Sequence, residues 1–361
     1  MLGRSSDPLE TPEKRGRPES RPQPGLAAPP FDRLGVMRVF ALAFAALLLE
    51  AQTVPAGLTR PGWPKHNPYS AAKAELGRTL FFDTRLSASG KFSCATCHQP
   101  ERAFADAKAV STGAAGAAEG RNAPSLINVA YARHLFWDGR SDSIEQATQE
   151  MLTLKPMDNR IEELEARLAK VEGYGPLFKD AFGDTMPSID RITEALATFQ
   201  RTLLSGNSPY DRYMSGEKTA LTEQQAAGKD LFSGKARCTL CHRGPTLSSG
   251  EFLNVGAGQA NPPDEGRFRI TRNAGDWRVF KVPGLREVAL TAPYFHDGSA
   301  ASLEEVIDFY DRGGEIADNK DVRLRPLNLS AVEKKALAEF LKALSGEGWQ
   351  HAKTAPQSLP K

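Results

Sequence analysis

The four cysteines of this 361-residue chain lie in two short motifs, each of which ends in a histidine. The first motif is Cys94-Ala-Thr-Cys97-His98, and the second is Cys238-Thr-Leu-Cys241-His242. In a Cys-x-x-Cys-His motif the two thiols add across the vinyl groups of a haem, and the histidine binds the iron from the proximal side. The spacing therefore predicts two covalently bound c-type haems.

Two other uses of paired cysteines fit the sequence less well. A zinc site built from four cysteines usually draws its pairs from within roughly 15–20 residues, whereas these pairs stand in different halves of the chain. Zinc would also not need both histidines. Thioredoxin-like redox chemistry needs only one pair in a βαβ context, and the sequence shows no such pattern.

Composition and charge exclude several broad classes of function. The chain carries 46 basic and 44 acidic residues, for a net charge of +2. With so little excess charge we do not expect nucleic acid or an anionic membrane surface as a partner. The apolar run from Val39 to Leu49 is shorter than the roughly 18 residues of a membrane span, so we expect no span in the mature chain.

The same run, preceded by Met37 and Arg38 and followed by small residues, has the pattern of a secretory signal peptide. We therefore predict a periplasmic protein. A buried helix or a retained anchor is the alternative, and Met37 is a second candidate for the initiator. Residues 1–36 are rich in Pro and Arg and lack periodicity, which predicts a disordered or mis-assigned leader.

An internal repeat indicates two related halves. The segment Ala74 to Phe81 recurs as Ala226 to Phe232, with Gly77 matching Gly228, and each copy precedes one of the motifs. Helical periodicity is common and strand alternation is scarce. We expect a mainly α protein with two cytochrome c-like haem domains, long loops and little β structure. The expected divisions are a signal peptide at 37–56, an N-terminal haem domain at 57–205, a C-terminal haem domain at 206–348 and a loose tail at 349–361.

The residue inventory limits the second axial ligand of each iron. No methionine follows the second motif, so the downstream candidates there are His296, Tyr310 and His351, with Met214 upstream. Tyr310 falls on the apolar face of a helix that Ser302 opens, which also suits an ordinary core tyrosine. After His98 no histidine occurs until His134, and the loop between them is made of small residues. An open, reactive first iron is the simpler interpretation.

Several longer segments resemble one family, the bacterial diheme cytochrome c peroxidases and the related enzyme MauG. They cover nearly all of residues 66–345 in family order. The matching segments are Leu76-Gly-Arg-Thr-Leu-Phe-Phe-Asp83, both Cys-x-x-Cys-His motifs, Arg121-Asn-Ala-Pro-Ser125, Phe136-Trp-Asp-Gly-Arg140, Arg201-Thr-Leu203, and Phe280-Lys-Val-Pro-Gly-Leu-Arg286 continuing into Leu290-Thr-Ala-Pro-Tyr-Phe-His-Asp-Gly298.

The resemblance implies a peroxidatic N-terminal haem, an electron-transferring C-terminal haem, and Trp137 as the bridge between them. Where peroxidases of this family carry a distal histidine, this chain has the Gly113-Ala114-Ala115 region. Where they place a methionine on the second haem, the alignment places Tyr310, as MauG has a tyrosine. A tyrosinate oxygen stabilises oxidised iron, so the second haem should have a low potential.

The resemblance also implies distal residues and a calcium ion. Gln146 and Asp158 correspond, with gaps, to the family's distal glutamine and acid, and Glu150 competes with Asp158. A carboxylate there would move a proton between the oxygens of bound peroxide. The family's calcium would bind the side chain of Asn122 and the backbone carbonyls of Lys281 and Pro283.

These observations predict an enzyme that reduces hydrogen peroxide at the His98 haem, with electrons arriving through the His242/Tyr310 haem. The donor would be a small cytochrome c or a cupredoxin. A MauG-like alternative oxidises a protein substrate at a distance to mature a quinone cofactor. A second alternative is a diheme electron carrier without catalysis.

Overall fold

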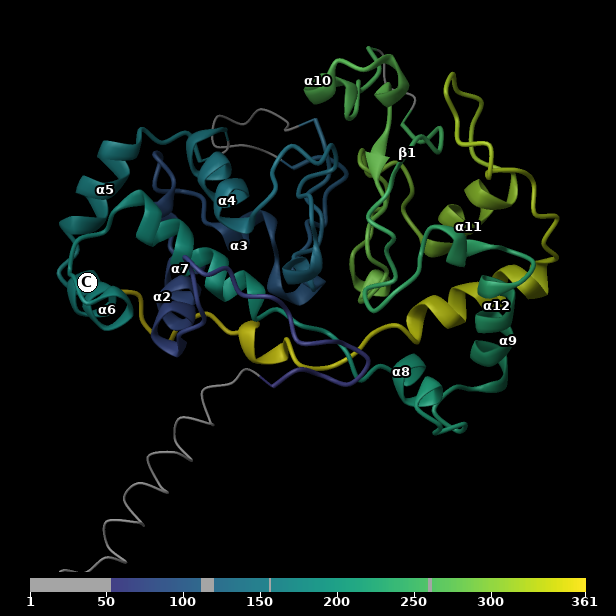
Figure 1. Ribbon diagram of the computed structural model, residues 1–361, viewed down its shortest axis with the longest axis horizontal. Helices are drawn as coiled ribbons and strands as arrows, with labels where there is room; N and C mark the ends of the chain where they lie inside the picture. Colours follow the sequence, from purple (N-terminus) through teal and green to yellow (C-terminus); the bar gives the residue numbers. More distant parts are fainter. Residues whose placement is uncertain (1–52, 112–119, 156, 259–261) are drawn as a thin grey trace, which may run out of the picture. The chain divides into compact units, whose positions relative to one another are not determined.

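The computed structural model describes residues 53–111, 120–155, 157–258 and 262–361. The predicted leader, most of the predicted signal peptide and the Gly113-Ala114-Ala115 region lie outside these residues. Most of the regular structure is helical (Figure 1), as predicted. Within the described residues the one sheet pairs β1 (Phe252–Leu253) antiparallel with β2 (Phe280–Lys281).

The helices fall into two sets along the chain. The first set is α2 (Ala71–Phe82), α3 (Cys94–Cys97), α4 (Ile144–Thr153), α5 (Ile161–Ala169), α6 (Tyr174–Phe182) and α7 (Ile189–Arg201). The second set is α8 (Pro209–Met214), α9 (Glu223–Ser233), α10 (Phe268–Thr271), α11 (Leu303–Asp311) and α12 (Ala331–Lys342). Short 3₁₀ turns join them, at Thr84–Leu86, Pro100–Arg102, Val129–Tyr131, Cys238–Leu240, Ala274–Asp276, Val288–Leu290 and Gln350–Ala352.

Side-chain caps begin several of the helices. The Ser70 hydroxyl accepts a hydrogen bond from the backbone of Lys73 at the start of α2. Complete capping boxes open α9, at Thr222 and Gln225, and α12, at Ser330 and Glu333. Each cap satisfies backbone N–H groups that have no partner within the helix. At the start of α11 the Ser302 hydroxyl accepts a hydrogen bond from the backbone of Glu305, and the Glu305 carboxylate accepts one from the backbone of Ala301.

The repeat predicted from Gly77 and Gly228 is present as two equivalent helix crossings. In the first, α2 packs on α7, and a Cβ added at Gly77 would lie 2.0 Å from the Ala195 carbonyl oxygen. In the second, α9 packs on α12, and a Cβ at Gly228 would lie 2.0 Å from the carbonyl oxygen of Ala336. Only glycine allows the two backbones to approach this closely.

Two clusters of buried apolar side chains accompany the two crossings. Phe81, Phe104 and Phe199 belong to the first, against which Cys94 packs. Phe232 and Phe340 belong to the second, against which Cys238 packs. Each Cys-x-x-Cys-His motif is therefore anchored on its own core. This arrangement is consistent with two haem domains, although their boundaries stay a prediction.

The C-terminal residues do not form the loose tail that we expected. Figure 1 shows the yellow C-terminal segment running from α12 back toward α6. Trp349 is buried in the first cluster, 6.1 Å from the ring centre of Phe104. The carbonyl oxygen of Lys361 accepts a hydrogen bond from Gly173. The composition of the tail gave no sign of these contacts, because one buried tryptophan is enough to anchor it.

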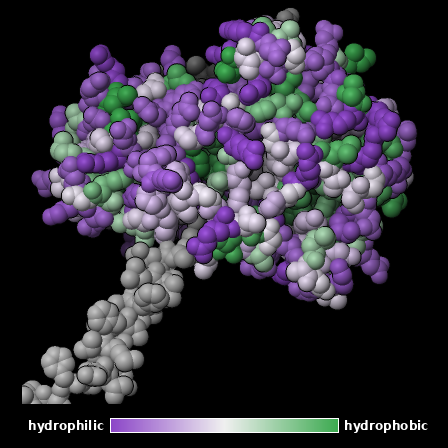
Figure 2. All heavy atoms as spheres, viewed as in Figure 1, coloured by the Kyte–Doolittle hydropathy of each residue, from purple (hydrophilic) through white to green (hydrophobic). Residues whose placement is uncertain are grey.

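The described helices are all too short or too polar to cross a membrane. Hydrophilic side chains cover most of the face in Figure 2, and the hydrophobic groups on it are scattered. Exposed apolar side chains such as Ile316 and Val322 lie between charged residues of the same loop. Scattered apolar side chains of this kind are normal on protein surfaces.

Candidate cofactor-binding site

The two motifs hold their histidines in the same way. In the first, α3 carries Cys94 and Cys97, and His98 Nδ1 lies 3.0 Å from the carbonyl oxygen of Phe104. In the second, His242 Nδ1 lies 3.0 Å from the carbonyl oxygen of Leu247. A neutral imidazole that donates from Nδ1 has a free Nε2 lone pair for a metal.

The surroundings of both histidines keep them neutral. Burial lowers the pKa of His98, and hydrogen bonding to the carbonyls of Phe104 and Pro124 opposes this effect only in part. Burial also lowers the pKa of His242, opposed in the same way by the carbonyls of Leu247 and Pro283. Because the neutral imidazole is the form that binds iron, both histidines are in the protonation state that an iron ligand needs.

None of the four cysteines forms a disulfide. Burial raises the pKa of Cys94 and of Cys238 to about 12, so both thiols stay protonated at neutral pH. In the described part of the chain, no three His, Cys, Asp or Glu side chains converge as metal ligands. This disfavours zinc, whose cysteine ligands are thiolates.

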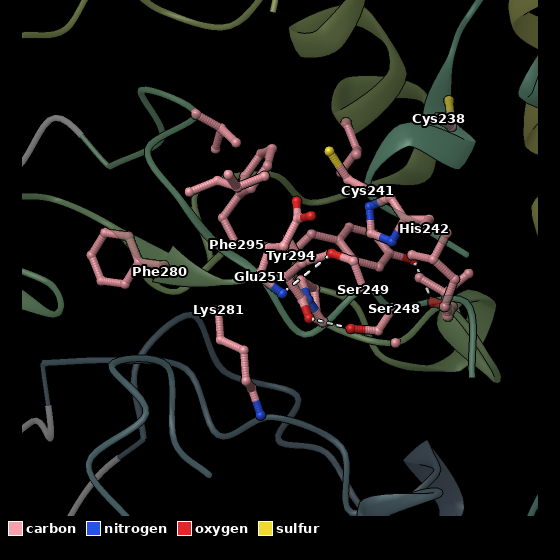
Figure 3. Close-up of a pocket in the computed structure, with 18 of the residues that line it drawn as sticks. Cys238, Cys241, His242, Ser248, Ser249, Glu251, Phe280, Lys281, Tyr294 and Phe295 are labelled. Atoms are coloured by element: carbon pink, nitrogen blue, oxygen red, sulfur yellow. Dashed lines mark hydrogen bonds between the residues drawn. The ribbon is translucent and has the colours of Figure 1, made fainter. Parts of the chain in front are cut away.

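A cavity of about 870 Å³ lies beside the second motif (Figure 3). It falls in the roughly 300–1,000 Å³ range of sites for cofactors and small molecules. Cys238, Cys241 and His242 line it, and Tyr310 from α11 lines it as well. The thiols, the imidazole and the phenol suit covalent attachment and axial ligation of a haem.

Tyr310 and His296 both line the cavity beside the second motif, and Tyr310 interacts electrostatically with Cys238 and Cys241. Burial raises the pKa of its phenol, and the nearby Cys238 and Cys241 raise it further. The phenol is therefore neutral unless a cation compensates, and a bound metal reverses such a preference. Of the competitors, Met214 and His351 are exposed, and His296 lies against Trp137.

Trp137 lies in the cavity wall that the N-terminal half contributes. Its indole Nε1 donates a hydrogen bond of 2.9 Å to the carbonyl oxygen of Asn122. The backbone N–H of Lys281 on β2 donates to the Trp137 carbonyl oxygen at 2.8 Å. The indole is thus held between the two halves of the chain, where a bridge is expected.

The candidate residues for the peroxide-binding side of the first haem do not lie together in one site. Gln146 is exposed, and its side-chain oxygen accepts a hydrogen bond from the backbone of Asp142, so it serves as a cap for α4. Asp158 is also exposed. Glu150, the competitor, is half-buried and accepts hydrogen bonds from Arg140 and Ser141. The described contacts place neither Gln146 nor Asp158 beside His98.

The three residues expected around calcium all line the cavity, but their polar groups have other partners. The Asn122 side-chain amide donates to the Lys108 carbonyl at 2.8 Å. The Pro283 carbonyl faces the His242 ring. Lys281 extends its ammonium toward the N-terminal half and donates to the His134 carbonyl at 2.9 Å (Figure 3). Burial lowers the pKa of Lys281 to about 8. Calcium stays a prediction.

A second part of the repeat pairs His296 and Met151 with two of the predicted site residues. The loop Leu135–Ser141 is closed by a bridge between its ends, and so is the loop Tyr294–Ala300. Aligning these loops pairs Trp137 with His296, and extending the alignment into α4 and α11 pairs Met151 with Tyr310. The signal was the recurring Phe-x-Asp-Gly, which the sequence analysis used only for the family resemblance.

Comparison with known proteins identifies the class to which this architecture belongs. Residues 71–219 match the family model described as di-haem cytochrome c peroxidase. The cytochrome-c peroxidase IdrP1 of Pseudomonas sp. (strain SCT) is 37% identical over 84% of this chain and 89% of its own length. Methylamine utilization protein MauG of Methylorubrum extorquens is 38% identical over 79% of this chain and 81% of its own length.

Solved structures agree with these relatives. A crystal structure of a MauG-like protein associated with microbial copper homeostasis is 34% identical, covers 85% of this chain and 99% of its own, and superposes with a TM-score of 0.79. The diheme peroxidase BthA from Burkholderia thailandensis shares the fold, with a TM-score of 0.68 at 23% identity over 86% of this chain and 95% of its own.

This chain therefore belongs to the family of di-haem cytochrome c peroxidases and MauG. It is a peroxidase-like oxidoreductase that uses two haems.

Proposed function

We propose that the chain reduces hydrogen peroxide at the haem held by Cys94, Cys97 and His98, and takes up electrons through the haem held by Cys238, Cys241, His242 and Tyr310. The observation that carries the proposal is the matched presentation of His98 and His242, each fixed by a backbone carbonyl at 3.0 Å. When bound, the haems supply irons that exchange electrons, one of them with a position open to peroxide.

The first site differs from the second in what faces its histidine. Tyr310 lines the same cavity as His242, and its repeat equivalent at the first site is Met151. We infer an open position on the first iron because no histidine follows His98 until His134, and an open position suits peroxide binding. Hydrogen bonding from His98 Nδ1 to Phe104 makes the other ring nitrogen a stronger ligand.

Peroxide cleavage needs a group that moves a proton from the inner to the outer oxygen. Asp158 and Gln146 are our candidates by resemblance, and Glu150 is the competitor of Asp158. Glu150 is half-buried, and Arg140 and Ser141 hold its two carboxylate oxygens in place. A carboxylate fixed in this way can accept and return a proton at the same point.

We also propose where the enzyme works, which protein supplies its electrons and which ion it binds. The apolar run from Val39 to Leu49 supports export to the periplasm, where covalent attachment of haem would follow. The electron donor is a small cytochrome c or a cupredoxin. A calcium ion at Asn122, Lys281 and Pro283 belongs to the proposal on the strength of the resemblance alone.

Turnover of hydrogen peroxide with a reduced small cytochrome c tests the proposal. We expect sustained oxidation of the cytochrome that depends on peroxide, and a resting ferric spectrum with one high-spin and one low-spin haem. The expected reason is the open position beside His98. Two low-spin signals without peroxide reactivity would contradict the proposal and favour a plain electron carrier.

Tyr310 specifically favours a second function, the MauG-like oxidation of a protein substrate to mature a quinone cofactor. An oxygen ligand stabilises oxidised iron, which suits storage of oxidising equivalents rather than rapid uptake of electrons. Negligible cytochrome turnover, together with a peroxide-induced spectrum that persists for minutes, would favour this function over peroxide reduction.

A further inference from the structure

The junction between the two halves is built from equivalent segments that exchange hydrogen bonds. Asn122 and Lys281 occupy equivalent places, each two residues before a proline, Pro124 or Pro283. The Asn122 N–H donates to the His296 carbonyl oxygen at 2.7 Å, and the Lys281 N–H donates to the Trp137 carbonyl oxygen at 2.8 Å. Each half therefore donates an equivalent backbone hydrogen bond to the aromatic loop of the other half, Leu135–Ser141 or Tyr294–Ala300.

These two aromatic loops have the same backbone conformation. Phe136 and Phe295 adopt left-handed φ values of 63° and 69°, and Gly139 and Gly298 follow at 72° and 66°. A left-handed φ at a phenylalanine is strained, so its occurrence at both positions indicates a shared structural need. That conformation directs the next residue, Trp137 or His296, into the junction.

The two rings meet there in an edge-to-face arrangement. The centres of the Trp137 and His296 rings are 6.5 Å apart, and their planes are inclined at 70°. His296 also stacks on Phe280 of β2, with ring centres 3.7 Å apart and planes inclined at 15°. All three side chains line the cavity beside the second motif.

The His296 ring has little freedom to leave this position. Its side chain is 4% exposed, and a Cβ added at Gly258 would approach its Nε2 to 2.7 Å. Burial lowers the pKa of His296, against the opposing effect of Asp297 and Asp264. A neutral aromatic ring packed between an indole and a phenyl ring acts as a rigid spacer.

We propose that His296 is the positioning partner of Trp137 in the electron connection between the two haem sites. The inference rests on the proposed bridging role of Trp137. One electron leaves one haem and enters the other in each event, and neither ring gains or loses a bond or a proton. His296 fixes the indole by edge contact, and its stack on Phe280 continues the aromatic contact toward β2.

The experiment measures electron redistribution in the protein carrying both haems, without peroxide. A single electron is introduced by flash photoreduction, and the absorbance of the two haems is followed with time. His296→Leu fills the site without an aromatic ring, and we expect redistribution to slow by about tenfold or more, since small misplacement of reacting groups costs rate steeply. His296→Phe keeps a flat ring and should stay within about threefold of the wild type, since the ring contacts are retained.

The control is His134→Leu, which alters another histidine of the same cavity wall whose ring partners are Asp142 and Phe252. We expect the wild-type rate. If His296→Leu does not take up both haems, His296→Gln, which also removes the ring, replaces it with the same expectation. Trp137→Leu is measured alongside and should also slow the redistribution. A wild-type rate in the ring-deleting His296 variant, with a slow rate in Trp137→Leu, would overturn the role of His296. Wild-type rates in both would overturn the Trp137 bridge as well.

Discussion

Replacing Tyr310 with Phe is expected to alter the absorption spectrum of the second haem and to raise its reduction potential. The substitution removes the Tyr310 phenol from the cavity that His242 also lines, while keeping the ring of this residue among Phe295 and Phe309. Because a phenolate oxygen stabilises the oxidised iron, its loss destabilises that state. A rise of about 59 mV or more corresponds to a tenfold or larger change in relative binding of the two states.

Tyr294→Phe provides a matched control for this measurement. Tyr294 lines the same cavity, but its hydroxyl donates to the Val288 carbonyl oxygen at 2.9 Å. Burial raises the pKa of its phenol to about 12, so this tyrosine stays protonated. We expect the wild-type spectrum and potential in this variant. An unchanged second haem in Tyr310→Phe would refute the ligand assignment.

Substituting Ala for Gly228 or for Gly77 is expected to destabilise the protein strongly. At Gly228 the added Cβ would lie 2.0 Å from the Ala336 carbonyl oxygen and 2.7 Å from the Cβ of Phe340. At Gly77 the obstacles are the Ala195 carbonyl oxygen at 2.0 Å and the Phe199 Cβ at 2.8 Å. These obstacles are backbone and Cβ atoms that cannot rotate away, so the crossing helices must separate.

Overpacking of this kind costs about 1–3 kcal/mol or more, and each kcal/mol lowers the midpoint of thermal unfolding by about 2–4 °C in proteins of 150–250 residues. Circular dichroism of the haem-loaded protein measures this midpoint. The control is Gly175→Ala in α6, where the nearest heavy atom would be 3.8 Å away. Alanine there should stabilise by up to about 1 kcal/mol. Equal midpoints in Gly77→Ala, Gly228→Ala and Gly175→Ala would contradict the crossing geometry.

Much of the local structure could be predicted because its signals are local. Capping residues such as Ser70 and Thr222 bond to the backbone three residues further along, so sequence spacing alone identifies them. The glycine pair was visible in the repeat. Even so, the repeat did not show what each glycine contacts, because Ala195 and Ala336 lie far along the chain.

The parts of the site that depend on contacts between the halves could not be read in advance. Nothing in the spacing of Gln146 shows that its amide would cap α4 through Asp142. Lys281 was expected to contribute only its backbone carbonyl, to calcium, yet its ammonium reaches the His134 carbonyl across the junction. His296 was weighed only as an iron ligand, although its position in the repeat pairs it with Trp137.

Mass spectrometry of the purified, exported protein tests the central claim most directly. The account predicts an intact mass above that of the polypeptide by two haems, with the added mass located on peptides containing Cys94 and Cys97 and on peptides containing Cys238 and Cys241. None of the four cysteines forms a disulfide, and each pair stands directly before His98 or His242, which is the spacing of a c-type haem attachment motif. A mass equal to that of the bare polypeptide, or haem on only one motif, would contradict the account.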